Sequence, residues 1–341
     1  MNKYTREDLK ILQALPLQVK IEKTKNRIIE WVDMYGLDGV YVSFSGGKDS
    51  TVLLDIARKL YPTTKAMFIN TGLEYPEIVQ FVKTFNNIDI IRPKMGFKEV
   101  ILKYGYPFIS KEVSQDLYYG KRYLKGEGIN TEVSLARVQG RVDKNRTIHK
   151  EVLPRELQSP FCHTKYAPLL ESEFYFHNAC CNVMKKAPAH KYQKENGRMG
   201  ITAQMASESL LRTQQWLANG CNGFNLKTPI SNPMSFWTEQ DVLKYIYDNK
   251  LPIASVYGEV IPKDGQYTLL EPQQFETTGC KRTGCMFCGY GCQQEKKGEG
   301  RFLKLKKSHP KIYDYIMRPD GLNYKAVIDD INERVGTNIE Y

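Results

Sequence analysis

The sequence predicts an α/β protein built on a doubly wound, mostly parallel sheet. Between about residues 40 and 104, short runs of β-forming residues alternate with segments whose apolar residues recur at helical spacing. The first strand is followed at once by a glycine turn, Ser45-Gly46-Gly47, and then by a helix. No apolar run approaches the roughly 20 residues needed to cross a bilayer. We therefore expect a soluble chain in which helices cover both faces of the sheet.

The expected elements follow the chain in order. A helix over 18–34 ends at Tyr35-Gly36 and precedes a strand over 40–44. The later strands are expected at 66–70, 88–91 and 200–206, and the later helices at 51–60, 76–85, 97–104 and 207–217. Thr238 can cap a further helix that runs to about residue 249, where Leu251-Pro252 closes it.

Three regions are expected along the chain. The first, 1–36, is a helical segment, and 37–260 forms the main α/β domain. Inside that domain, the stretch at about 107–160 is polar with few long apolar runs, and we interpret it as a mobile or substrate-facing insertion. The last region, 261–341, carries a cysteine-rich segment and a basic tail.

Composition and charge indicate the cellular compartment and the kind of binding partner. The 341 residues carry a net charge of +11, which favours a polyanionic partner such as a nucleotide, tRNA or DNA, although a solvated basic surface explains it equally well. The polar N-terminus lacks the apolar core of a secretory signal, so we expect a cytoplasmic protein. In that compartment, clustered cysteines indicate metal binding or redox chemistry.

The segment Ser45–Ser50 has the composition of a phosphate-binding loop. Its two glycines let backbone N–H groups converge on an anion, and the helix that follows adds the partial positive charge of its N-terminus. Lys48 can supply a charge to phosphate, Asp49 can hold Mg²⁺, and the hydroxyls of Ser45 and Ser50 can donate hydrogen bonds. The alternative is a glycine turn that binds nothing. The residues expected to bind nucleotide here are Ser45, Gly46, Gly47, Lys48, Asp49 and Ser50.

These residues resemble the Ser-Gly-Gly-x-Asp-Ser signature of the PP-loop ATP pyrophosphatases, the adenine nucleotide alpha-hydrolase superfamily. The resemblance implies a Rossmann-like sheet of that type, and ATP cleaved with Mg²⁺ between its α and β phosphates. The segment 70–76 resembles the Asp-Thr-Gly-aromatic-Pro segment of the branch that reduces phosphoadenosine phosphosulfate (PAPS), which implies contacts from Thr71 and Gly72. Likewise, 207–212 resembles a Ser-x-x-Arg helix start that implies phosphate or sulfate contacts from Ser209 and Arg212.

A second group of motifs involves cysteine. Cys285 and Cys288 form a C-x-x-C, which suits half of a zinc site, a redox pair or half of an iron–sulfur site. Cys180-Cys181, with Lys185 and Pro188, resembles the Cys-Cys-x-x-Arg-Lys-x-x-Pro segment of adenylyl-sulfate (APS) reductases, in which the paired cysteines and a later C-x-x-C hold a [4Fe-4S] cluster. The alternative set, Cys280, Cys285, Cys288 and Cys292, resembles DndC-like proteins of DNA phosphorothioation. Zinc and free thiols remain further alternatives.

The assignment of function follows from where the resemblance ends. No Glu-Cys-Gly-x-His motif, which supplies the thiol nucleophile of assimilatory reductases, occurs in the sequence. We therefore expect ATP to be cleaved to AMP and pyrophosphate to activate an acceptor for iron–sulfur-assisted sulfur transfer, with Lys48, Asp49, Lys185 and Arg212 taking part. The sulfur donor would be a partner such as a cysteine desulfurase or a thioredoxin-like reductant. Two alternatives are an APS or PAPS reductase that uses Cys162, Cys221 or Cys292, and a non-catalytic subunit that binds nucleotide or nucleic acid.

Overall fold

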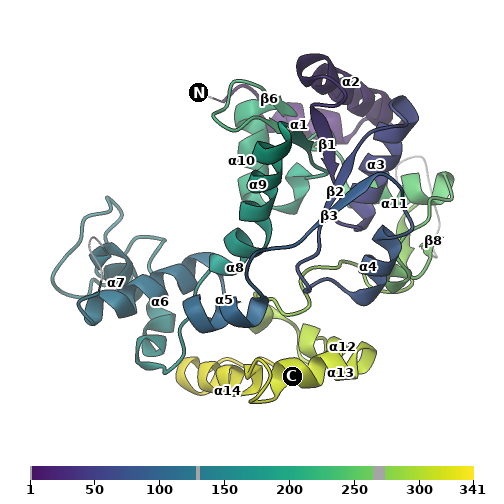
Figure 1. The fold of residues 1–341 in the computed structure, drawn as a ribbon. Helices are drawn as coiled ribbons and strands as arrows, with labels where there is room; N and C mark the ends of the chain where they lie inside the picture. Colours follow the sequence, from purple (N-terminus) through teal and green to yellow (C-terminus); the bar gives the residue numbers. More distant parts are fainter. Residues whose placement is uncertain (1, 128–130, 264–272) are drawn as a thin grey trace. The chain divides into compact units, whose positions relative to one another are not determined.

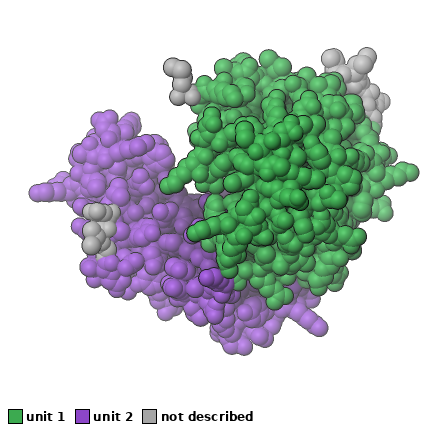
Figure 2. Space-filling view, turned by 45° about the horizontal axis from the view of Figure 1, so that its top comes forward, with its two compact units in different colours: residues 1–93, 187–284 green, residues 94–186, 285–341 purple. Residues whose placement is uncertain are grey.

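The computed structural model describes residues 2–127, 131–263 and 273–341 (Figure 1). The chain forms two compact units, each discontinuous in sequence (Figure 2). Unit 1 comprises Met1–Pro93 and Ala187–Gly284, and unit 2 comprises Lys94–Lys186 and Cys285–Tyr341. The sequence analysis expected contiguous regions instead, because a shift in composition does not reveal that a chain leaves a unit and later returns to it. Residues 264–272, inside the expected cysteine-rich region, lie outside the described residues.

Unit 1 is built around a six-stranded sheet with the order β3-β2-β1-β5-β7-β6. All neighbouring strands run parallel except β6, which pairs antiparallel with β7. The doubly wound, mostly parallel sheet is thus confirmed. The strands span β1 Val40–Ser43, β2 Ala66–Ile69, β3 Ile88–Ile91, β5 Met199–Ile201, β6 Asn222–Gly223 and β7 Ile230–Ser231.

Alternation along β1 explains why helices cover both faces of this sheet. Val40 and Val42 are fully buried in the large core that includes residues of α2 (Leu17–Tyr35) and α3 (Lys48–Leu60). Tyr41 points to the opposite face, where its ring lies 5.0 Å from that of Tyr192 in α9 (Ala187–Asn196). Successive side chains of a strand face opposite sides, so each side of β1 needs a helical cover.

The remaining helices of unit 1 begin and end at local signals. The helix expected over 207–217 is divided into a 3₁₀ turn, Ala206–Glu208, and α10, because Ser209 adopts an extended conformation and caps α10. Thr238 caps α11 as predicted, with a reciprocal bond from its own amide to Asp241. The helices are α1 Arg6–Gln13, α4 Pro76–Val82, α10 Leu210–Asn219 and α11 Glu239–Asp248, and strands β8 Val260–Pro262 and β9 Phe275–Thr277 form a separate pair.

Unit 2 is mainly helical. The polar stretch after β3 folds into helices, and the basic tail forms three more. Each helix has an apolar face, which the many charged residues make hard to recognise in the sequence. In the tail, for example, Phe302 and Tyr324 are fully buried. None of the described helices is both long and apolar enough to cross a membrane. The helices are α5 Phe97–Tyr104, α6 Lys111–Leu124, α7 Glu132–Gln139, η1 Thr164–Glu171, α8 Ala179–Cys181, η2 Asn182–Lys186, η5 Cys292–Gln294, α12 Arg301–Ser308, α13 Pro310–Met317 and α14 Tyr324–Val335. Strand β4 (Phe108–Ile109) pairs parallel with β10 (Gly289–Tyr290).

Candidate functional site

The candidate nucleotide site lies where the strand order of unit 1 reverses. The chain moves from β1 to β2 and β3 on one side, and β5 then pairs with the other side of β1. In open α/β sheets, ligands bind outside the carboxyl ends of the strands at such a switch point. The three segments expected to contact nucleotide, 45–50, 70–76 and 207–212, follow β1, β2 and β5 respectively.

The loop after β1 requires glycine at its second position. Gly46 has a φ of +72°, and a Cβ there would lie 2.8 Å from the Cγ2 atoms of both Ile78 and Val82 in α4. Gly47 is the N-cap of α3. The amides of Asp49 and Ser50 belong to the first turn of that helix and have no acceptor inside it. The helix N-terminus therefore presents donors and a partial positive charge at the end of β1.

The two serines of the loop bond to the loop itself. The amide of Ser45 donates to Ser50 Oγ at 3.1 Å, and the amide of Gly47 donates to Ser45 Oγ at 3.3 Å. Ser50 Oγ in turn donates to the Gly47 carbonyl at 3.0 Å. Two of the loop amides are therefore engaged by its own side chains. That these hydroxyls donate to a phosphate stays a prediction.

Lys48 is held by two acceptors. Its side chain is only 6% exposed, and its Nζ donates to the Lys281 carbonyl at 2.8 Å and lies 3.6 Å from Glu239 Oε1. Burial lowers the pKa of Lys48, and the negative charges of Glu239 and Asp49 oppose that effect. Oxygens of a bound anion could therefore take the place of the Lys281 carbonyl and Glu239 as acceptors for the Lys48 ammonium.

Asp49 lies at the centre of a charged cluster in unit 1. Burial raises the pKa of Asp49, while the charges of Lys48, Arg282 and Arg212 lower it and that of Glu239 raises it again. Glu239 also lies 3.8 Å from the Nη2 atom of Arg282. Three cations thus lie around Asp49 and are paired with Asp49, Glu239 and, at Arg212, with Glu208. An anionic ligand could replace these carboxylates as their partner.

Tyr257 covers the same loop. Its hydroxyl forms a short hydrogen bond with Thr283 Oγ1 and accepts from the backbone N–H of Lys48. The Nζ of Lys48 lies 5.4 Å from the centre of the tyrosine ring. Burial raises the pKa of Tyr257 to about 12, so the hydroxyl keeps its proton at neutral pH.

The segment after β2 is fixed by its own hydrogen bonds. Thr71 Oγ1 donates to Glu74 Oε1 at 2.7 Å, and the Thr71 amide donates to Glu74 Oε2 at 3.0 Å. Gly72 has a φ of +75°, and its amide donates to Asn70 Oδ1 at 3.2 Å. The contacts that the resemblance implies for Thr71 and Gly72 stay predictions.

The segment after β5 presents a capped helix. Ser209 Oγ accepts from the Arg212 amide at 3.3 Å, and the Arg212 guanidinium forms a short ion pair with Glu208. Burial lowers the pKa of Arg212, and the charge of Asp49 opposes this shift. Arg212 is thus within electrostatic reach of Asp49, and Ser209 caps the helix. The phosphate or sulfate contacts that the resemblance implies for both residues stay predictions.

Sequence analysis did not predict Glu239, Lys281, Arg282 or Thr283 as part of this site. Glu239 follows the predicted cap Thr238, and 281–283 adjoins the cysteine-rich segment. Such short signals could have drawn attention to these residues, but only the fold brings them to the loop after β1.

The cysteine site lies in unit 2. Cys180 is buried and Cys181 half-buried in α8, while Cys285 and Cys288 precede β10. A hydrogen bond with Cys181 and burial raise the pKa of Cys180, and the charges of the other three thiols raise it further. The remote set of four cysteines is therefore gathered within one unit.

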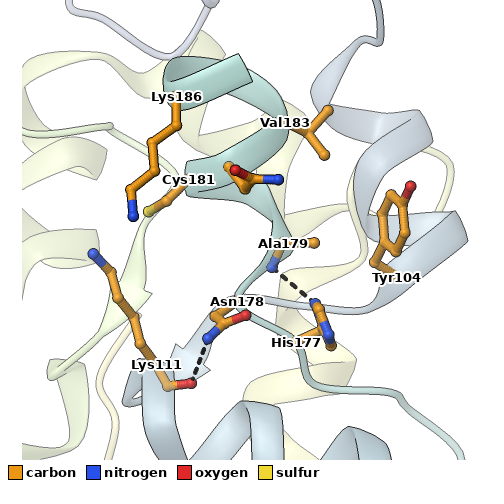
Figure 3. Close-up of a pocket in the computed structure, with 9 residues that line it drawn as sticks. Tyr104, Lys111, His177, Asn178, Ala179, Cys181, Val183 and Lys186 are labelled. Carbon is orange, nitrogen blue, oxygen red and sulfur yellow. Dashed lines mark hydrogen bonds between the residues drawn. The ribbon is translucent and has the colours of Figure 1, made fainter. Parts of the chain in front are cut away.

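Cys181 faces a positively charged cavity of about 430 Å³ (Figure 3). The hydrogen bond from Cys180 lowers the pKa of the Cys181 thiol, and Lys111 and Lys185 lower it further, Lys111 both by its charge and by a hydrogen bond. Lys111 and Lys186 line the cavity and extend toward the side on which the Cys181 sulfur lies. The expected Lys185 thus influences Cys181, and Lys111 and Lys186 are additional cations that the sequence analysis did not select.

The alternative cysteine set is divided. Cys280 belongs to unit 1, where its charge affects Tyr257. Cys292 is buried and donates its thiol to the Gly289 carbonyl at 2.8 Å, and burial raises the pKa of Cys292 to about 12. Within the three described ranges, no group of three or more His, Cys, Asp or Glu side chains is arranged to hold a metal ion. The four thiols of the remote set are therefore neighbours and not a formed coordination shell.

Known proteins resemble this chain at two levels. The model of the phosphoadenosine phosphosulfate reductase domain matches residues 39–112 and 150–289, well over half of the chain. An uncharacterized protein of Methanocaldococcus jannaschii is 38% identical over 73 residues, and the match spans 20% of this chain and 18% of that relative. A crystal structure of phosphoadenylyl-sulfate reductase from Candida auris, in complex with phosphate, aligns with 74% of this chain and 91% of its own at 16% identity and a TM-score of 0.37. On the match to the family model, the chain belongs to the phosphoadenosine phosphosulfate reductase domain family, within the adenine nucleotide alpha-hydrolase superfamily.

Proposed function

We propose that this member of the family is an enzyme that binds ATP in unit 1 and cleaves it to AMP and pyrophosphate, in order to activate an acceptor for sulfur transfer. The observation that carries the proposal is the charged cluster at the switch point of the sheet, in which the cations Lys48, Arg212 and Arg282 all lie within electrostatic reach of Asp49. Such a cluster suits a polyphosphate, whose charge it would compensate only in part without a metal ion.

The two carboxylates favour ATP over a sulfonucleotide. Protein-bound Mg²⁺ is typically held by one or two carboxylates together with waters and substrate phosphates, and Asp49 and Glu239 meet that requirement beside the loop. Mg²⁺ held by these carboxylates would reduce the effective charge of the phosphates. Lys48, now bonded to Lys281 and Glu239, would turn to a phosphate oxygen, and Arg212 would bind another.

The proposed reaction has two displacements. An oxygen of the acceptor attacks the α phosphorus of ATP, the bond from that phosphorus to the bridging oxygen breaks, and pyrophosphate leaves with both electrons. A sulfide-level sulfur then displaces AMP from the activated acceptor. Neither step changes an oxidation state, so the balance needs only ATP, the acceptor and hydrosulfide or its protein-bound equivalent. The residues of unit 1 bind and orient the phosphates in the first step.

Unit 2 would hold a [4Fe-4S] cluster on Cys180, Cys181, Cys285 and Cys288. The fit rests on four thiols from one unit that affect one another's pKa, with Lys111 and Lys185 favouring the thiolate of Cys181. When bound, a cluster would supply electrons or a binding site for sulfide. Lys111 would keep its hydrogen bond to the Cys181 sulfur and so stabilise its negative charge. A cysteine desulfurase would supply the sulfur as a persulfide, and a thioredoxin-like dithiol would supply the two electrons that reduce it to the sulfide level before the second displacement.

The second candidate function is reduction of APS or PAPS, which needs a thiolate nucleophile. Burial raises the pKa of both Cys221 and Cys292, which makes them poor nucleophiles near neutral pH. The Cys162 thiol donates to the Val142 carbonyl at 3.4 Å. These environments favour ATP cleavage over sulfonucleotide reduction as the proposed reaction.

The test uses anaerobically purified full-length protein with Mg·ATP, hydrosulfide and a panel of candidate acceptors. Equal amounts of AMP and pyrophosphate, formed only with an acceptor, are the expected result. Sulfite release from APS or PAPS without AMP and pyrophosphate from ATP would instead establish the second candidate. Tight binding of ATP, APS or PAPS with no turnover of any of them would instead favour a non-catalytic subunit that binds nucleotide.

A further inference from the structure

Two neighbouring cavities open in unit 2. The first, of about 430 Å³, is the cavity at Cys181, and the second, of about 590 Å³, has four tyrosines and a phenylalanine among the residues that line it. Tyr104 lines both, so the two share a wall. Both volumes fall within the roughly 300–1,000 Å³ of small-molecule sites. Nothing in the proposed chemistry of unit 1 uses the second cavity.

Aromatic rings form the walls of the second cavity. The rings of Tyr104 and His177 are stacked, with centroids 6.0 Å apart and an interplanar angle of 29°. Tyr118 packs edge-on against His177 at 4.2 Å and against Tyr175 at 5.9 Å. The tyrosine rings are half-buried, so each is fixed by packing and still presents surface to the cavity. Rigid, partly exposed rings of this kind are platforms on which a nucleobase can stack.

Cations accompany these rings. The Arg122 guanidinium lies 5.7 Å from the centre of the Tyr118 ring, and Lys125 Nζ lies 5.1 Å from that of Tyr175. The second cavity also contains two carboxylates, and one of them, Glu127, lies 3.6 Å from Arg122. Its own charge is therefore close to balanced, which suits a neutral base better than a phosphate.

The first cavity has the opposite character. Lys111 and Lys186 contribute two positive charges, and no Asp or Glu is among the described residues that line it. Both lysines are exposed, so their ammonium groups are accessible to a bound anion. A neutral base in the second cavity and a phosphate at the two lysines of the first would match the chemistry of the two cavities.

We propose that the two cavities together bind single-stranded nucleic acid, with an unpaired base among Tyr104, Tyr118 and Tyr175 and an adjoining phosphate at Lys111 and Lys186. A base inside a duplex is stacked on both faces and paired at its edge, so it cannot enter a cavity that has aromatic rings in its wall. The inference rests on unit 2 alone and does not depend on ATP cleavage. Should the proposed function also hold, a nucleic acid would be the acceptor whose reacting group is brought to Cys181.

The test is a binding titration of the full-length protein without ATP. The probes are fluorescein-labelled 12-mers of dT and of U, a duplex of the same length and a polyphosphate of matched charge. We expect Tyr175→Leu to weaken binding of the single strands about 5- to 100-fold, and Tyr175→Phe to retain it. Lys186→Gln should also weaken binding and reduce the salt dependence by about 0.7 in log–log slope. A difference between the dT and U probes would distinguish DNA from RNA as the natural ligand.

Matched variants and a second measurement keep the result interpretable. Tyr247→Leu, at an exposed tyrosine of α11, and Lys10→Gln, at an exposed lysine of α1, should bind the probes like the unaltered protein. Photo-cross-linking of the unaltered protein to 5-iodouridine oligonucleotides should label the peptides that contain Tyr104, Tyr118 or Tyr175. Equal binding of duplex or polyphosphate, equal losses in Tyr175→Leu and Tyr247→Leu, or cross-links confined to other peptides would overturn the proposal.

Discussion

The nucleotide site of unit 1 and the cysteine site of unit 2 are assembled in different ways. In unit 1, three segments follow three adjacent parallel strands, so the sheet itself brings them to one edge. Their polar groups are already bonded, as Lys48 is to Lys281 and Thr71 is to Glu74. In unit 2, the cysteines come from two segments about a hundred residues apart, and lysines line an open cavity beside them. The first site is thus fixed by the sheet, and the second depends on contacts between segments that are distant in sequence.

One of these long-range contacts is the pairing of β4 with β10. Gly289 pairs with Phe108 and Tyr290 with Ile109, directly after the C-x-x-C segment. The Tyr290 hydroxyl also donates to the His177 carbonyl at 3.1 Å, three residues before Cys180. These contacts hold the two cysteine segments in a common framework. Substitutions can therefore alter one site while leaving the other intact.

The largest effect is expected from removing a cysteine of the remote set. Protein with Cys180→Ser or Cys285→Ser should lose nearly all of its iron and acid-labile sulfide, of which we expect about four each per chain, because a cubane needs four ligands. Cys280→Ser and Cys292→Ser should keep their iron, since Cys280 lies in unit 1 and the Cys292 thiol is bonded to Gly289. Anaerobic metal and sulfide analysis measures this. The opposite pattern, with iron lost on changing Cys280 and Cys292, would select the alternative set.

The next effect concerns Lys48. Lys48→Met should lower the rate of AMP and pyrophosphate formation about 100- to 1,000-fold, since it removes a buried positive charge from the phosphate loop. Lys59→Met, near the other end of α3 and half-exposed, is the matched control and should change the rate little. Iron content should be unchanged in both variants. A Lys48→Met protein with full activity would contradict the assignment of this loop as the phosphate site.

The sequence predicts local elements and motifs better than it predicts which distant residues meet, for a physical reason. From 40 to 104 each βα pair has a local signature, and the structure confirms those elements nearly residue by residue. The loop at 45–50 is likewise a contiguous motif. By contrast, Glu239 and Arg282 reach Asp49 only through the fold, and neither has a periodic pattern that marks it. Lysines such as Lys111 look like solvated surface until a cavity and a thiol are seen beside them.

A smaller effect is expected at the pairing of β4 with β10. A Cβ at Gly289 would lie 2.6 Å from the Phe108 ring, so Gly289→Ala must displace a fully buried aromatic side chain. We expect a loss of about 1–3 kcal/mol in the free energy of unfolding and weaker retention of iron. Gly284→Ala is the control, because a Cβ there meets nothing within 4 Å and Gly284 directly precedes Cys285. Chemical unfolding with parallel iron analysis measures both, and equal behaviour of the two variants would show that the pairing does not support the cysteine site.

The smallest effect is a pH dependence of unit 2. Burial lowers the pKa of His177 to about 4, and its Nδ1 accepts the Ala179 amide, which requires the unprotonated ring. An ordinary histidine titrates near 6.5, so as the pH falls the unfolded chain takes up this proton before the folded one. The unprotonated His177 therefore stabilises the folded chain fully above about pH 6.5, and this stabilisation is lost progressively toward pH 4. The resulting loss in the free energy of unfolding is about 1 kcal/mol between pH 7 and 5.5.

The matched variant for this effect is His177→Asn, which keeps an acceptor for the Ala179 amide but does not titrate. The difference in unfolding free energy between the two proteins should therefore narrow as the pH falls from 7 to 5.5. Because the imidazole is enclosed by Tyr104, Tyr118 and Tyr119, its proton uptake reports on the packing beside the cysteines, and not on the charged loop of unit 1. A difference that stays constant over this range would mean that His177 titrates alike in the folded and unfolded chain, and that the aromatic wall of unit 2 admits water.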